Sequence, residues 1–182
     1  MGERLRLLPQ RHRPGSNVLT SPLSRPPRSG EQSFSGPLPG HDDAGLVFIG
    51  RFRSAFSTRD DCPKNRRAAL EAGSPGRLEV DRPWREALEG LNAGDHIFCL
   101  SWLHGAARDL ALQKPRHAET ARGTFSLRSP VRPNPIGLHL ARIESLDVEA
   151  GIVLLDAIDV VDGTPLLDIK PYFASVDRPE EG

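Results

Sequence analysis

Short apolar runs separated by small and polar residues fill the chain from about residue 46 onward. Runs of this length, rich in β-branched and aromatic residues, are typical of β-strands. The most apolar run, residues 95–103, predicts a central strand. The pattern predicts further strands at residues 46–52, 77–80, 124–128, 138–146, 152–158 and 166–170.

Helical periodicity is clear in one segment only. Trp84, Ala87, Leu88 and Leu91 recur at helical spacing after Pro83, which favours a helix start. Residues 104–122 are polar and predict a loop with at most one helical turn. Because strands dominate, we expect a mainly β fold. The interpretation is an antiparallel or mixed β-barrel with one or two short helices, and not a doubly wound α/β sheet.

The apolar pattern is missing from residues 1–44, which are rich in Pro, Arg, Ser and Gly. Such a composition offers too little apolar surface to offset the entropy of ordering, so we expect a disordered arm. The alternative is a loose RNA-binding arm, which the four acidic residues in this stretch disfavour. The predicted organisation is therefore an arm at 1–44, a barrel domain at 45–177 and a tail at 178–182.

Overall charge and cysteine content restrict the class of protein. The formal net charge is zero and the pI is near 7.0, so any contact with nucleic acid must come from a local patch. Two cysteines, Cys62 and Cys99, are too few for a disulfide framework. With no signal peptide or membrane-spanning run, we expect a cytoplasmic protein with no membrane partner. A metal site at His96, Cys99 and His104 is disfavoured, because their spacing matches no known ligand pattern.

A stiff, arginine-bearing segment occupies residues 123–137. Its three prolines, at 130, 133 and 135, fix φ and remove backbone donors. The resulting extended loop presents Arg128, Arg132 and Asn134, whose guanidinium and amide groups suit recognition of a carboxylate, a phosphate or a base edge. A purely structural connector with its arginines in solvent is an equally weighted alternative.

A second informative segment spans residues 159–172. Asp162-Gly163 is a strong turn signal between two strands. The turn amides and the Thr164 hydroxyl are candidates for binding a ligand's polar edge, and the nearby aspartates for facing an ammonium or sulfonium. A plain hairpin is the alternative for the turn, and a surface ion pair is the alternative for Asp168 and Lys170.

Taken together, the strings RSPVRPNPIG and DGTPLLDIKPY closely resemble the two signature motifs of the TsaA-like (TrmO) family. The resemblance covers about residues 46–177. It implies a β-barrel methyltransferase that uses S-adenosylmethionine (SAM) and is usually a homodimer. The implied reaction adds a methyl group to N6 of N6-threonylcarbamoyladenosine at position 37, in the anticodon loop of tRNA.

The resemblance also implies the site residues. Those matched to the family's SAM site are Pro63, Lys64, Asn65, His104, Gly105, Arg128, Leu138, Asp162, Gly163, Thr164 and Pro165. Arg132, Asn134 and Lys170 are candidates for binding the tRNA substrate. Attack by a urea-like nitrogen favours a catalytic base, for which His104, Asp168 and Tyr172 remain equivalent candidates. No metal is expected.

This sequence departs from the family pattern in two places. Family members often carry Pro-Arg-Gln in the early loop, where this chain has Pro63-Lys64-Asn65. Lysine keeps the charge and loses the bidentate fork. Several relatives continue into a further C-terminal domain, whereas this sequence ends ten residues after Tyr172. The methyl donor is therefore better supported than the acceptor. The alternative is a SAM-binding protein with another acceptor or without catalytic activity.

Overall fold

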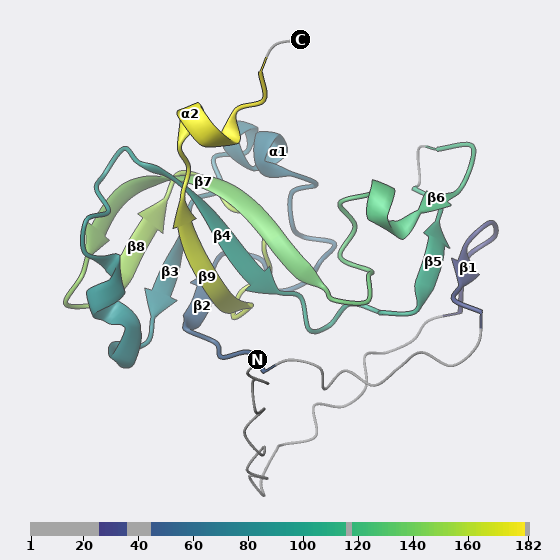
Figure 1. Ribbon diagram of the computed structural model, residues 1–182, viewed down its shortest axis with the longest axis horizontal. Helices are drawn as coiled ribbons and strands as arrows, with labels where there is room; N and C mark the ends of the chain where they lie inside the picture. The colour runs from purple at the N-terminus through teal and green to yellow at the C-terminus, as the bar shows by residue number, and fades with distance from the viewer. Residues whose placement is uncertain (1–25, 36–44, 116–117, 181–182) are drawn as a thin grey trace, which may run out of the picture.

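Six antiparallel strands close into a barrel in the order β2-β3-β8-β7-β4-β9 (Figure 1). The computed structural model describes residues 26–35, 45–115 and 118–180. The barrel strands are β2 (Gly50–Arg53), β3 (Gly76–Val80), β4 (His96–Trp102), β7 (Ile136–Asp147), β8 (Ile152–Leu155) and β9 (Pro165–Pro171). The predicted mainly β barrel is confirmed. The disorder expected for residues 1–44 falls largely outside the described residues.

Strand β4 is central, as its apolar sequence predicts. It pairs with β7 along its whole length, from His96↔Arg142 to Trp102↔Ile136. On its other side it pairs with β9, from Ile97↔Pro171 to Ser101↔Leu166. Strand β9 then pairs with β2, which closes the barrel and leaves it without a free edge.

Alternate residues of the strands fill the barrel interior. Ile97 and Cys99 of β4 are fully buried, and so are Ala141 and Ile143 of β7. They join Phe52, Leu78, Leu155 and Leu166 in one apolar cluster. Burial of this kind contributes about 1.5–3 kcal/mol for each large aliphatic or aromatic side chain. Apolar residues recur at every second position of these strands because every second side chain points into this core.

The barrel has two distinct ends. Because neighbouring strands are antiparallel, β4 ends where β7 and β9 begin, and the loops at residues 54–65, 103–109, 127–135 and 156–164 share that end. We call it the motif end. The opposite end carries the 3₁₀ helix η1 (Arg82–Leu88), whose Leu88 is 2% exposed and packs in the apolar cluster.

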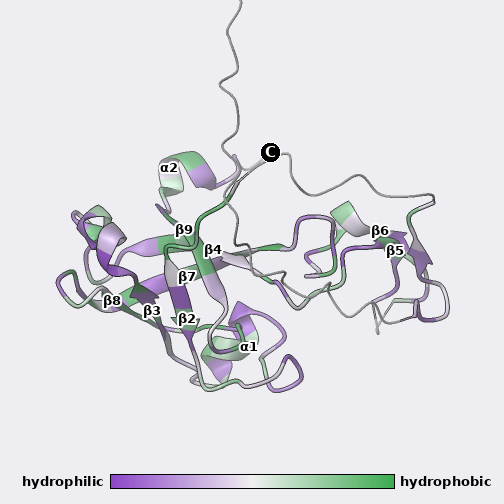
Figure 2. Cartoon of the chain, turned by 90° about the horizontal axis from the view of Figure 1, so that it is seen from below, coloured by the Kyte–Doolittle hydropathy of each residue, from purple (hydrophilic) through white to green (hydrophobic). Residues whose placement is uncertain are grey.

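A small three-stranded sheet stands beside the barrel in both ribbon views (Figures 1 and 2). It consists of β1 (Gln32–Ser33), β5 (Leu110–Gln113) and β6 (Arg122–Gly123) in the order β1-β5-β6. Buried Gln113 holds it to the chain that follows by donating to the Thr124 hydroxyl at 2.8 Å and to the Val131 carbonyl at 2.6 Å. Its first strand comes from the segment in which we expect a disordered arm.

Local predictions differ from the structure in four places. The predicted strand at 124–128 is wrong, because residues Thr124–Ser126 form the 3₁₀ helix η2. The predicted loop at 104–122 contains β5 and the first residue of β6. The predicted helix after Pro83 is the 3₁₀ helix η1. Helix α1 (Arg66–Glu71) was not predicted, although Asn65 caps it by accepting from the Ala68 amide at 3.0 Å. A short C-terminal helix, α2, covers Ala174–Asp177.

Candidate functional site

The two signature segments reach the motif end on either side of β4. The first leads directly into β7 and the second into β9. The pairs Ser101↔Gly137 and Ser101↔Leu166 show that one residue of β4 has both segments as neighbours. The amide of Leu103, just beyond β4, donates to the Pro135 carbonyl at 2.8 Å. Residues more than twenty positions apart in sequence are thereby gathered at one end of the barrel.

Arg108 holds the proline loop, residues 127–135, in place. Its Nε donates to the Pro133 carbonyl at 2.5 Å, and a terminal nitrogen lies 3.3 Å from the Asn134 side-chain oxygen. The guanidinium also lies over the Trp102 ring, 5.4 Å from its centroid. Such a cation–π contact is worth about 0.5–2 kcal/mol, depending on solvent exposure. Partial burial lowers the pKa of Arg108 without removing its charge.

The Asp162–Gly163 turn is fixed by its own backbone. The amides of Asp162 and Gly163 donate to the carbonyls of Phe56 and Phe52, and the Thr164 amide and hydroxyl both donate to the Val161 carbonyl. Gly163 has φ of +75°, the left-handed conformation that glycine adopts without strain. With its donors engaged, the turn can offer a ligand only oxygen atoms.

The carboxylate of Asp162 is also engaged. It accepts from the Ser54 amide at 3.1 Å and pairs with Arg53 at 3.2 Å. Arg53 in turn pairs with Glu79 at 2.8 Å. Hydrogen bonds from Arg53 and Arg77 lower the pKa of Glu79. The turn is therefore tied to β2 and β3, and a shallow cavity of about 510 Å³ opens beside Asp162, Arg53 and Leu154.

The early loop and the proline loop present charged groups at the same end. Lys64 and Arg128 are exposed, and no described residue forms an ion pair with either. Arg132 donates to the Leu127 carbonyl within its own loop at 3.4 Å. Asn65 uses its side chain for the α1 cap. Two of these predicted groups, Lys64 and Arg128, are thus available to an anionic ligand.

The three candidate bases fall into two groups. His104 and the neighbouring Gly105 are exposed at the motif end, two and three residues beyond β4. Asp168 lies on β9 and pairs with Lys170 at 2.9 Å. Tyr172 follows β9, and its amide donates to the His96 carbonyl at the far end of β4. His104 and Tyr172 are therefore at opposite ends of the barrel.

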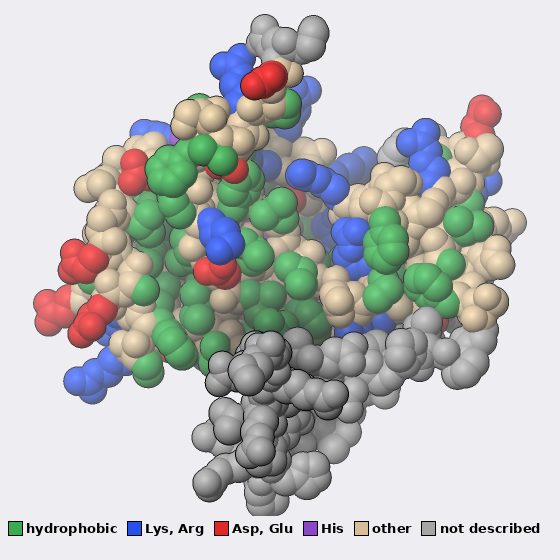
Figure 3. Space-filling model, in the orientation of Figure 1, with side chains coloured by type: hydrophobic (Ala, Val, Ile, Leu, Met, Phe, Trp, Pro, Cys, Tyr) green, Lys and Arg blue, Asp and Glu red, His purple; other side chains and the backbone are tan. Residues whose placement is uncertain are grey.

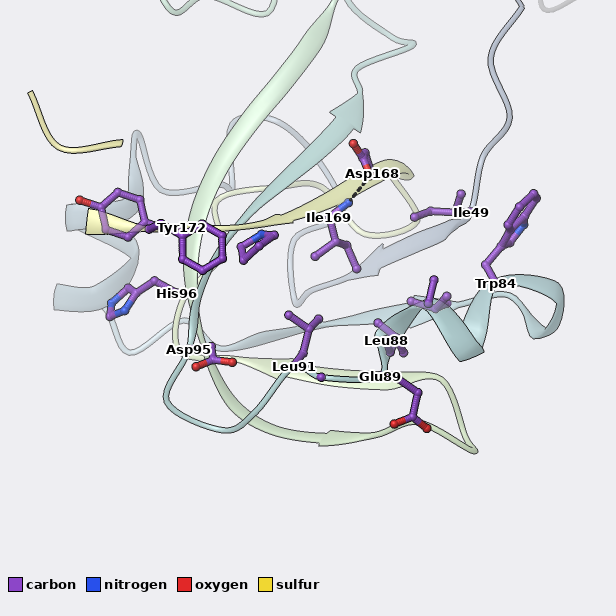
Figure 4. Close-up of a pocket in the computed structure, with 15 residues that line it drawn as sticks. Ile49, Trp84, Leu88, Glu89, Leu91, Asp95, His96, Asp168, Ile169 and Tyr172 are labelled. Carbon is purple, nitrogen blue, oxygen red and sulfur yellow. Dashed lines mark hydrogen bonds between the residues drawn. The ribbon is translucent and has the colours of Figure 1, made fainter. Parts of the chain in front are cut away.

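Asp168 and Tyr172 line a cavity of about 640 Å³ between η1 and β9. Figure 4 shows Tyr172 and His96 at one side of this cavity, Trp84 and Ile49 at the other, and Leu88, Leu91 and Ile169 between them. The rings of His96 and Phe98 make edge contacts with Tyr172, with centroids 6.4 and 5.7 Å away. No residue of the proline loop lines it.

The outer face of β7 and β4 is apolar, and the Asp168–Lys170 ion pair of β9 lies beside it. Ile136 and Leu138 are 39% and 50% exposed, and Phe98, Leu100 and Trp102 are half-buried beside them. Figure 3 shows hydrophobic side chains gathered over these strands. Leu138, predicted to line the SAM site, belongs to this face. An exposed patch of this kind marks an interaction site more often than a solvated surface.

Ser101 and His139, which sequence reasoning missed, form a chain inside the motif end with Asp159, one of the aspartates predicted to face an ammonium or sulfonium. Ser101 Oγ lies 2.8 Å from His139 Nε2, and His139 Nδ1 lies 3.1 Å from Asp159 Oδ1. A signal was present: Ser101 has the parity of Ile97 and Cys99 along β4, and His139 that of Ala141 and Ile143 along β7. Polar residues at inward positions of a barrel strand call for a polar partner.

Cysteine and metal chemistry find little support here. Burial raises the pKa of the Cys99 thiol to about 12, so it stays protonated inside the core. His96 and His104 lie at opposite ends of β4. Within the described ranges, no three His, Cys, Asp or Glu side chains are grouped as metal ligands. Every helix in those ranges is too short or too polar to span a lipid bilayer.

The fold and the site define the class of protein: a closed antiparallel β-barrel whose candidate ligand site is built from loops at one end of the barrel. In a doubly wound α/β protein the ligand would instead bind in a crevice at the carboxyl ends of parallel strands. The chain belongs to the family described as the tRNA-methyltransferase O N-terminal domain, whose model matches residues 51–178.

Similar proteins agree with this membership. The "Probable S-adenosyl-L-methionine-binding protein VirR" of Rhizobium radiobacter is 42% identical over 134 residues, which cover 74% of each chain. The mouse "tRNA (adenine(37)-N6)-methyltransferase" is 37% identical over 141 residues, 72% of this chain and 31% of the relative. The crystal structure of TrmO from Pseudomonas aeruginosa superposes with a TM-score of 0.60 at 33% identity, covering 76% of this chain and 60% of that one. This chain therefore spans about a third of the mouse relative's length.

Proposed function

We propose that this protein transfers the methyl group of SAM to N6 of N6-threonylcarbamoyladenosine at position 37 of tRNA. One observation carries the proposal: in a member of a tRNA methyltransferase family, both signature segments flank the same residue of β4 at the motif end. Members with a related sequence bear the names of SAM-binding proteins and tRNA (adenine(37)-N6)-methyltransferases.

SAM supplies an activated methyl on a sulfonium, so the protein has no electrophile to create. In the transfer a bond forms between N6 and the methyl carbon, the carbon–sulfur bond breaks, and N6 gives up its proton. The chain's task is to align nucleophile, methyl and sulfur and to exclude water.

The side chains at the motif end suit such a donor. The exposed guanidinium of Arg128 matches a carboxylate, with Lys64 as the second cation. The Asp162–Gly163 turn, its amides already engaged, turns oxygens to its surroundings and so suits a positively charged sulfonium. Leu138 on the adjacent outer face offers apolar contact. Arg132 and Lys170 suit the threonyl carboxylate or flanking phosphates, because an anticodon-loop base can be splayed out at low cost.

The site is proposed to be completed by a second copy of the chain. The seven residues of β9 cover about 20 Å from the turn to Tyr172. A base must come within about 3 Å of the proton that it removes. If Tyr172 acts on a methyl held at the motif end, it therefore comes from the partner of a homodimer.

The apolar outer face of β7 and β4, with Asp168 and Lys170 of β9 beside it, is the proposed dimer surface. Replacing Ile136 by Glu puts a charge into this face, and we expect a monomer in light scattering after size exclusion. Leu154→Glu is the matched control, because Leu154 is 42% exposed on β8, outside the face. Equal behaviour of the two variants would contradict the dimer surface.

Mixing two inactive variants tests whether the partner supplies the base. We expect Arg128→Ala and Tyr172→Phe each to lose activity. Random pairing then gives half heterodimers with one intact site of two, and recovers about a quarter of the wild-type rate. Full activity of Tyr172→Phe would instead assign the base role to His104 or Asp168.

Nucleoside mass spectrometry tests the reaction itself. Incubated with SAM and tRNA from cells lacking this modification, the full chain should convert threonylcarbamoyladenosine to its N6-methylated form. A second candidate function is SAM binding with another acceptor. Two relatives that are named only as SAM-binding proteins favour this second function, and the matched region covers 74% and 90% of their lengths. SAM binding without the methylated nucleoside would support that alternative, and absence of both would contradict the two proposals.

A further inference from the structure

Ser101, His139 and Asp159 form a continuous hydrogen-bonded chain across three elements. Ser101 is on β4, His139 on β7 immediately after the first signature segment, and Asp159 in the loop that leads to the second. An ionised carboxylate only accepts hydrogen bonds, so the neutral imidazole carries its proton on Nδ1 and accepts from the Ser101 hydroxyl at Nε2. Burial raises the pKa of Asp159, but the hydrogen bond from His139 opposes it, and the pKa lies below its ordinary value.

The order of groups is that of a hydrolase triad, but the surroundings exclude nucleophilic attack by the serine. Ser101 is fully buried near the motif end of β4. A Cβ added at Gly137 would lie 2.2 Å from its Oγ and 2.5 Å from His139 Nε2. The space next to the Ser101 hydroxyl is too small for one added carbon atom, so it cannot admit a substrate carbonyl. Ser101, His139 and Asp159 therefore do not perform acyl transfer.

The same close approach shows what the first motif's glycine contributes. Only a residue without Cβ at position 137 leaves room for the Ser101 hydroxyl and the His139 ring to meet. The ring is further fixed by Phe52, which packs edge-on with centroids 5.5 Å apart. With 13% of its side chain exposed, His139 is held on three sides inside the motif end.

His139 also spans the distance between the two signature segments. It follows Leu138, a proposed SAM contact, and its partner Asp159 precedes the Asp162–Gly163 turn by three residues. The other side-chain hydrogen bond that the described residues form between β7 and the loop at 156–164 runs from the Arg142 amide to the Asp156 carboxylate at 2.9 Å, farther from the turn. The geometry points to one role, which rests on the proposed function: we propose that His139 is a positioning residue that sets the Asp162–Gly163 turn against the strand carrying Leu138.

Two substitutions separate the two halves of the imidazole. In His139→Asn the amide nitrogen takes the place of Nδ1 and can donate to Asp159, while the contact with Ser101 is lost. In His139→Gln the longer amide reaches Ser101 and loses Asp159. If His139 only filled space, the Asn and Gln variants would behave alike. The positioning role predicts that only the Asp159 contact matters for the turn.

Hydrogen–deuterium exchange of the full chain measures the turn without any ligand. The amides of Asp162, Gly163 and Thr164 are all hydrogen-bonded, so their protection reports whether the turn is held. We expect His139→Gln and Asp159→Ala to speed exchange at residues 159–164 at least tenfold. His139→Asn should stay within threefold of wild type. Glu144→Gln, an exposed change on the same strand, is the control.

SAM affinity, measured by calorimetry, should follow the same order. We expect His139→Gln and Asp159→Ala to weaken SAM binding at least fivefold and His139→Asn to change it less than twofold. The positioning role is overturned if Gln and Asn variants behave alike, or if faster exchange spreads evenly over the barrel. Labelling of Ser101 by a fluorophosphonate would also overturn it. If the wild-type chain binds no SAM, the proposed function fails, and the exchange result alone decides the role of His139.

Discussion

The two ends of the barrel are closed in different ways. At the opposite end the 3₁₀ helix η1 covers the core with apolar Leu88, and the neighbouring cavity is lined by Trp84, Leu91 and Ile169. At the motif end the interior carries Ser101 and His139, and the loops above them are joined by side-chain hydrogen bonds. Apolar burial dominates at the first end, where Arg85 of η1 adds hydrogen bonds to the Val80 and Glu149 carbonyls, and side-chain hydrogen bonds dominate at the motif end.

This difference separates stability from ligand recognition. Apolar burial is non-directional and tolerates small shifts, whereas hydrogen bonds and ion pairs fix groups at set distances and angles. A protein that must align a methyl donor gains from directional contacts at the end where the ligand binds. The comparison therefore predicts that changes at the η1 end affect unfolding, and changes at the motif end affect SAM binding.

The largest effect is expected at the apolar end. Leu88→Ala removes a side chain that is 2% exposed, and should lower the free energy of unfolding by about 2–5 kcal/mol. SAM affinity measured well below the melting temperature should not change. Thermal unfolding and calorimetry check the two parts, with the exposed Glu86→Ala as control. A loss of SAM affinity in Leu88→Ala would break the comparison.

At the motif end, Arg128→Ala should weaken SAM binding about ten- to a hundredfold, since a hydrogen bond to a charged group is worth about 1.5–3 kcal/mol. The melting temperature should stay close to that of wild type, because Arg128 is exposed. Arg128→Lys should bind SAM with an affinity between those of wild type and Arg128→Ala, because lysine keeps the charge and loses the bidentate guanidinium. Arg82→Ala, on η1, is the matched control at the other end. Unchanged affinity in Arg128→Ala would move the donor site elsewhere.

A smaller effect is expected from the residue that holds the proline loop. Arg108→Lys loses the stacking on Trp102 and the paired contacts with Pro133 and Asn134. We expect about fivefold weaker SAM binding, equivalent to about 1 kcal/mol, together with faster amide exchange in residues 127–135. Arg122→Lys on β6 should change neither. If the loop stays protected in Arg108→Lys, another contact holds it.

The smallest effect is expected in the pH dependence of stability, through Asp159. The pKa of Asp159 is lowered in the folded protein, so its contribution to stability is present above the ordinary carboxyl pKa of 3.8 and is lost as the pH falls through the lower folded value. Wild type should therefore exceed Asp159→Asn in unfolding free energy by about 1 kcal/mol at pH 5. The difference should shrink as the pH is lowered below 3.8. A difference that grows toward low pH would contradict the assigned sign.

The barrel could be predicted from sequence because its strands are amphipathic or wholly apolar. The runs around Ile97, Ile143 and Val153 alternate or stay apolar for the length of a strand, and each strand is present. Strand β5 was missed because four residues, Leu110–Gln113, give too short a pattern between loops. The turn at 124–128 looked like a strand because Phe125 and Leu127 alternate with polar residues, yet Phe125 is 77% exposed.

The candidate site divides in the same way. Residues in the two contiguous motifs were found because they are adjacent in sequence. The contacts that hold the site join residues far apart in sequence. Arg108 and Pro133 are 25 positions apart, Ser101 and His139 are 38 apart, and His139 and Asp159 are 20 apart. Nothing in sequence spacing alone brings such positions together. The inward registers of Ser101 and His139 were the signals that alternation offered.

Amide exchange of the full chain with and without SAM tests the central claim most directly, because it compares the two ends in one experiment. The account predicts that SAM slows exchange in residues 127–138 and 159–165 and leaves residues 84–95 unchanged. Protection confined to the cavity between η1 and β9 would contradict it.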